Sequence, residues 1–189
     1  MDRGRRRQDQ RTRTKTAEKR ALLDRAKHEA GHAVFALMID VEFRDVTIVP
    51  YLPIYPMHMI GSEAPVIRTA LGGLRHNIGT VNYANDWDWA CLSMAGLAGE
   101  RIDWKSSGTF TGRDLFGGSY DDWYTAREEV RKFSTPGAVD KWINRVLADA
   151  WDRLLLEKAW HTRLVNLLLK KGTVEYGEVA DLCSPKWAA

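Results

Sequence analysis

Cysteine is scarce in this sequence of 189 residues, which contains only Cys91 and Cys183. The two lie far apart in apolar surroundings and form no CxxC pair. We therefore expect neither a disulfide nor a cysteine metal site. Two reduced thiols are typical of a cytoplasmic protein, and the cytoplasm is the location that we predict.

Long apolar segments are missing as well. The longest uninterrupted apolar run, residues 33–39, is too short to cross a bilayer, and no signal-peptide core follows the basic start. The sequence also lacks the GxxxxGK[ST] loop that binds nucleotide phosphates. These absences predict a soluble protein without a membrane partner and without its own means of using ATP.

Charge is unevenly distributed along the chain. The formal net charge is +3, yet residues 1–20 hold nine Lys or Arg against three acidic residues. No apolar residue stands between Met1 and Ala17, so we predict a disordered basic arm over residues 1–15. The simplest interpretation is a solvated arm, and weak contact with nucleic acid or an acidic partner is the alternative. Residues 16–189, in a chain with 44% hydrophobic residues, are predicted to form one domain.

The motif with the most chemical content is the run from His28 to His32, which reads His-Glu-Ala-Gly-His and matches HExxH. It lies inside a predicted helix from about residue 16 to residue 38. Histidines four residues apart share one helix face, where both imidazoles can hold one zinc ion. Glu29, beside the first of them, can reach a water molecule at the metal. The pattern predicts a zinc peptidase.

Two core histidines on an ordinary amphipathic helix are the alternative interpretation. At 100° per residue, the apolar positions between Leu22 and Leu37 fall on one arc of the helix. His28 and His32 fall on roughly the opposite side. We therefore expect the helix to pack its apolar face on the core and to present both histidines to a cleft, which favours the metal site.

The remaining sequence predicts a mainly α fold with a small sheet of short strands beside the HExxH helix. Strands are expected within residues 41–49 and at residues 79–83, and the second could form an edge to which a peptide substrate adds. Helices are expected from Asn85 or Asp86 to about Asp103, from Asp121 or Asp122 onward, and from Pro136 to Gly172, followed by a short turn or helix over residues 173–182. Residues 51–77 and 104–120 are predicted to be loops.

A catalytic zinc site of this type needs a third protein ligand and an open position for water. Acidic residues downstream are the candidates. Asp122 stands at a predicted helix start with Asp121 and Asp114 nearby, and Glu100 lies near the end of the preceding helix. Residue types alone do not rank the four.

These segments together resemble the peptidase domain of the FtsH-type, membrane-anchored AAA proteases. The matching segments are residues 28–34, 46–50, 95–100, 118–123 and the closing part of the chain to residue 182. The resemblance implies an FtsH-like metallopeptidase domain over residues 16–189, with Asp122 as the zinc-binding aspartate and Glu100 in a structural role. Full-length members also carry an ATPase module and transmembrane segments, which we do not find here.

The expected function is a zinc-dependent endopeptidase in which His28, His32 and Asp122 hold the metal. Glu29 would take a proton from water and return it to the leaving amine. Expected substrates are peptides and flexible or unfolded protein segments, cut without ATP; a separate unfoldase and self-association into a homo-oligomer are both compatible with the sequence. The alternative is a regulatory or catalytically silent protein of the same fold that binds one protein or nucleic-acid partner.

Overall fold

The computed structural model describes residues 3–50, 73–75, 84–111, 114 and 120–183, and residues 3–13 by their backbone alone. The elements in chain order are α1 (Arg3–Met38), β1 (Asp45–Thr47), β2 (Gly73–Arg75), α2 (Asp86–Glu100), α4 (Tyr120–Arg131), a 3-10 turn (Pro136–Ala138), α5 (Val139–Leu156), α6 (Lys158–Lys171), β3 (Thr173–Glu175) and α7 (Tyr176–Leu182). The predicted fold class, mainly α with a small sheet, is confirmed. Among the described segments, no helix is both long and apolar enough to cross a bilayer.

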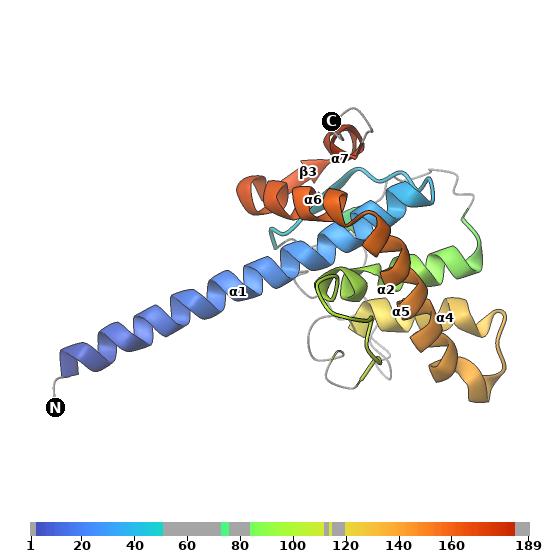
Figure 1. The fold of residues 1–189 in the computed structure, drawn as a ribbon, viewed down its shortest axis with the longest axis horizontal. Helices are drawn as coiled ribbons and strands as arrows, with labels where there is room; N and C mark the ends of the chain where they lie inside the picture. The colour runs from blue at the N-terminus through green and yellow to red at the C-terminus, as the bar shows by residue number, and fades with distance from the viewer. Residues whose placement is uncertain (1–2, 51–72, 76–83, 112–113, 115–119, 184–189) are drawn as a thin grey trace, which may run out of the picture.

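Helix α1 begins at Arg3 and projects far beyond the other elements (Figure 1). We expected the helix to start near Thr16 after a disordered arm over residues 1–15, whereas the structure continues it through that arm. The physical reason is local. No proline interrupts residues 3–38, and the Arg, Gln and Lys residues that dominate the arm are good helix formers. Residues 14–24 are exposed, so packing contributes little to this part of α1.

The part of α1 from residue 29 to residue 36 is covered on all sides, since these residues are all buried. It packs chiefly against α2 and α6. Glycines let the α1 and α2 backbones approach closely, because a Cβ on Gly31 would collide with the carbonyl oxygen of Ala95 and one on Gly99 would lie 2.6 Å from that of Lys27. The single apolar stripe that we expected is therefore too simple: Leu22, assigned to it, is exposed, and the opposite face is buried under α2.

The sheet has the order β2-β1-β3, and β1 pairs antiparallel with both neighbours. The strand expected within residues 41–49 is confirmed, but it is only three residues long. Two strands were not predicted, since β2 lies in a segment assigned to loop and β3 in the terminal turn. The predicted strand at residues 79–83 lies outside the described residues.

The helices between β2 and β3 begin and end close to their predicted limits. Asn85 caps α2, and its side-chain oxygen accepts a hydrogen bond of 2.9 Å from the backbone N–H of Asp88. The helical region expected from Pro136 to Gly172 consists of a 3-10 turn, α5 and α6, with a break at Glu157. Gly172 ends α6 with a φ of 80°, a conformation that glycine adopts readily.

Candidate metal centre

Three side chains from two helices meet at the middle of the molecule. His28 and His32 come from α1, and Asp122 comes from the first turn of α4. The Nε2 atoms of the histidines lie 3.2 Å apart, and Oδ2 of Asp122 lies 2.9 Å from Nε2 of His28 and 3.4 Å from that of His32. One ligand atom from each residue thus lies within 4.8 Å of the others, a spacing that could hold a metal ion.

The far side of each imidazole ring is held by a hydrogen-bond acceptor. Nδ1 of His28 lies 2.7 Å from Oε1 of Glu100, and Nδ1 of His32 lies 2.8 Å from the backbone carbonyl oxygen of Leu92. Because both partners accept, Nδ1 is the donor in each ring, and Nε2 of a neutral ring then carries a lone pair. Acceptors on the second nitrogen are the usual way in which metal-binding histidines are oriented.

In neutral rings, the three atoms that face one another at the centre, two Nε2 atoms and Oδ2 of Asp122, include no hydrogen-bond donor. With both rings neutral, the buried Oδ2 of Asp122 has no hydrogen-bond donor among the residues that the structure describes. A buried carboxylate oxygen opposite two imidazole lone pairs is unfavourable unless a cation lies between them. The donor set of two imidazoles and one carboxylate fits a metal ion, and it is compatible with zinc although not specific to it.

The pKa shifts of the three groups indicate that a positive charge is favourable between them. Burial by itself would lower the pKa of His28, but the Asp122 carboxylate outweighs it and raises that pKa well above the usual value. The pKa of His32 is raised by the same carboxylate against the same effect of burial. Burial would raise the pKa of Asp122, yet the two histidines lower it well below its ordinary range. Protons and a metal ion therefore compete for this position.

Glu29 lies next to His28 on α1 and is only 7% exposed. Burial raises the pKa of its carboxyl group above the ordinary value, although the charges of His28 and His32 oppose the shift. A carboxyl group of raised pKa beside a metal group is the usual setting of a general base.

Gly96 on α2 is what allows α2 to lie against both imidazoles. A Cβ at this position would lie 2.5 Å from Nε2 of His28 and from Nε2 of His32. Real Cβ atoms do not approach other atoms so closely, so only glycine leaves the ligand atoms room. Sequence reasoning missed Gly96 and the Leu92 carbonyl. Glycine within an otherwise helical run, at positions 96 and 99, was the signal that could have suggested a close contact.

The structure separates the four acids that the sequence left unranked. Asp122 is the one that lies with the histidine Nε2 atoms. Glu100 contacts His28 at Nδ1 instead. Asp114 forms an ion pair of 2.5 Å with Arg101, and Asp121 is exposed on α4. Of the predicted site residues, His28, His32 and Asp122 lie together, and their charges act on the buried Glu29. Glu100 contacts the far side of the His28 ring.

The sequence matches no protein-family model, and no curated protein matches it significantly. The likeness to FtsH-type peptidases thus depends on the segments described above, and the activity that it implies stays a prediction.

Proposed function

We propose that the chain is a zinc-dependent endopeptidase. The observation that supports this most strongly is the convergence of two imidazole Nε2 atoms on an unpartnered, buried carboxylate oxygen of Asp122. Three protein ligands leave the fourth position of a tetrahedral zinc ion to water or substrate, which is the arrangement of catalytic rather than structural sites.

Glu29 is the general base in this proposal. Zinc, when bound, acts as a Lewis acid on the peptide carbonyl and lowers the pKa of water. Glu29 takes a proton from the attacking water and returns it to the nitrogen of the leaving amine. Its burial beside His28 keeps the carboxylate away from bulk solvent, where its basicity would be lower.

The proposed substrates are peptides and flexible or unfolded protein segments. Hydrolysis needs an extended backbone at the metal, and folded domains expose one only in loops or through local opening. Global opening of a stable domain costs about 5–15 kcal/mol. The sequence holds no phosphate-binding loop to couple ATP to that work, so we expect cleavage independent of ATP unless a separate unfoldase assists. Cys91 and Cys183 are both free and buried, which suits a cytoplasmic protein.

Zinc content and casein digestion by the purified chain test this function. The wild type should hold about one zinc ion per chain and digest casein equally with and without ATP. Glu29→Gln should keep the zinc and lose about 10²–10⁴-fold in rate, because it removes the base and leaves the ligands. Glu128→Gln, an exposed acid on α4, is the matched control and should behave as the wild type.

Different failures have different meanings in this experiment. Zinc binding without digestion would support the catalytically silent alternative, in which the fold binds a protein or nucleic-acid partner. An active Glu29→Gln variant would disprove the role of Glu29. A wild type that binds no zinc would disprove the metal site itself.

A further inference from the structure

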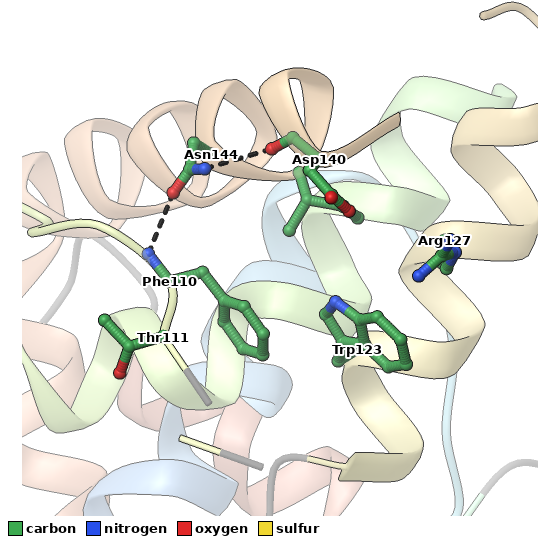
Figure 2. A pocket seen from close by; sticks show the side chains of 7 residues that line it. Phe110, Thr111, Trp123, Arg127, Asp140 and Asn144 are labelled. Carbon is green, nitrogen blue, oxygen red and sulfur yellow. Dashed lines mark hydrogen bonds between the residues drawn. The ribbon is translucent and has the colours of Figure 1, made fainter. Parts of the chain in front are cut away.

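A separate hollow of about 280 Å³ lies between α4, α5 and the segment that follows α2. Trp123 and Arg127 of α4 line it, one helical turn apart on a face that Asp122 does not share. Phe110 enters from the segment after α2, and Asp140 and Asn144 come from α5, as Figure 2 shows. None of these residues belongs to the metal centre, so the hollow needs an explanation of its own.

The apolar wall of the hollow is preorganised. The rings of Phe110 and Trp123 are stacked, with centroids 6.2 Å apart and planes inclined by 5°. Asn144 holds this arrangement, because its side-chain oxygen accepts a 2.8 Å hydrogen bond from the backbone N–H of Phe110 and its amide donates to the carbonyl of Asp140 (Figure 2). Rigid aromatic surfaces bind ligands at a low cost in entropy.

Arg127 places a positive charge in the lining of the same hollow. Its guanidinium lies 5.0 Å from the centre of the Trp123 ring, and its buried Nε has no hydrogen-bond partner within the described segments. Asp140 lines the hollow too, but no ion pair between these two side chains is found in the described part of the chain. Arg101, in contrast, donates to the Ser107 carbonyl and to Asp114. An acceptor that entered the hollow would meet the positively charged guanidinium in its lining, and it could satisfy Nε once the atoms that cover this nitrogen move aside.

We propose that this hollow binds a carboxylate attached to an apolar group. The planar guanidinium of Arg127 favours a carboxylate, which it can bind through two parallel hydrogen bonds. The Phe110–Trp123 wall favours an apolar or aromatic body, and the hollow has room for about one amino acid residue of a ligand. The C-terminal residue of a peptide and a free organic acid share this chemistry. The site does not depend on the metal centre or on the proposed peptidase activity.

N-acetylphenylalanine and its amide form a matched pair of probes, since they differ in the carboxylate and share the aromatic body. Titration of the zinc-loaded wild type by calorimetry should show binding of the acid and at least about tenfold weaker binding of the amide. In NMR spectra the Nε–H signal of Arg127 should shift with the acid, which separates this site from a carboxylate bound at zinc. Equal affinity of acid and amide, or an unmoved Arg127 signal, would overturn the proposal.

The two sources of the carboxylate are distinguished by a longer probe. N-acetyl-Gly-Gly-Phe, with a free C-terminus, should bind more tightly than N-acetylphenylalanine if the hollow receives a peptide end. The reverse order assigns the site to a free acid. Whichever acid binds more tightly, its amide should bind more weakly than the acid itself.

Variants test the residues themselves. Arg127→Gln should weaken binding of the acid by at least about tenfold, whereas Arg131→Gln, an exposed arginine on the same helix, should leave it unchanged. Wild-type affinity in folded Arg127→Gln would overturn the proposal. If Arg127→Gln does not fold, Trp123→Leu serves instead: it should weaken N-acetylphenylalanine but not N-acetylglycine, and an equal effect on both would count against the aromatic wall.

Discussion

Glu100 holds the imidazole of His28 from the side opposite Asp122: its Oε1 lies 2.7 Å from Nδ1, while Oδ2 of Asp122 lies 2.9 Å from Nε2. The two acids therefore have different roles at one ring. Asp122 is in a position to share an ion with the histidines, and Glu100 fixes the tautomer and orientation of His28. Both acids were candidates for the third ligand from the sequence, and this contact distinguishes them.

The first prediction follows from these different roles. Asp122→Ala should abolish zinc binding, because it removes a ligand, whereas Glu100→Gln should weaken it by up to about 10–100-fold, because a neutral amide oxygen accepts from Nδ1 of His28 less strongly than a carboxylate. Competition with a chromogenic chelator measures both. Asp121→Ala, an exposed neighbour in the same turn, is the control and should bind as the wild type. Retention of zinc by Asp122→Ala together with its loss in Glu100→Gln would reverse the assignment.

The second prediction concerns Gly96. Gly96→Ala adds a Cβ 2.5 Å from both ligand nitrogens, so the imidazoles or α2 must move. We expect zinc affinity and casein digestion to fall together by at least about tenfold, since ligand positions are held within about 0.5 Å in working sites. Gly177→Ala on α7 is the matched control, because no atom of the described residues lies within 4 Å of a Cβ added there. Normal zinc affinity in Gly96→Ala would mean that the centre tolerates a larger separation of α1 and α2.

The third prediction concerns the Arg101–Asp114 ion pair, whose side chains are 5% and 13% exposed. Asp114→Ala leaves the buried guanidinium without its carboxylate and should lower the free energy of unfolding by about 3 kcal/mol. Denaturation in urea measures the change. Glu128→Ala breaks the exposed pair with Arg131 and should cost about 0.5 kcal/mol or less. Equal losses in the two variants would show that burial does not set the contribution of the first pair.

The fourth prediction uses the pH dependence of stability. Burial lowers the pKa of His161, although the hydrogen bond from its Nε2 to the carbonyl of Lys27 acts in the opposite direction. The unfolded state therefore binds this proton first, and the contribution of His161 to stability falls as pH drops below about 6.5.

His161→Gln separates this effect from that of the other titrating groups, because the amide can still donate to the Lys27 carbonyl. The free energy of unfolding of the variant minus that of the wild type should increase from pH 7 to pH 5. Urea denaturation of the two proteins at each pH provides the comparison. A constant difference would show that His161 is protonated as easily in the folded protein as in the unfolded chain.

Features with a strong local signal were predictable from the sequence. The helix that carries His28 and His32 follows from its residue pattern, and Asn85 is an N-cap that sequence rules find directly. Strands β2 and β3 were missed because, unlike β1 beside the β-branched residues 46–49, neither lies in a longer run with strand character. The start of α1 was misjudged because a segment without apolar residues gave no reason to expect order.

The parts of the candidate site that depend on tertiary contact were not predictable. Glu100 was an alternative ligand in the sequence because nothing in its neighbours tells which atom of His28 it approaches. The carbonyl of Leu92 has no signature at all, since every residue has one. Both contacts depend on how α2 crosses α1, which Gly96 and Gly99 permit but do not specify on their own.

Asp122 follows His32 by 90 residues in the chain, yet the two share one small space. An ion bound there would link α1 to α4. The unfolded chain would have to close a long loop to bind the same ion, which costs conformational entropy. Its binding energy would then resist unfolding, and the melting temperature would rise with the concentration of free zinc. Shortage of zinc would thus lower both the free energy of unfolding and the proposed peptidase activity.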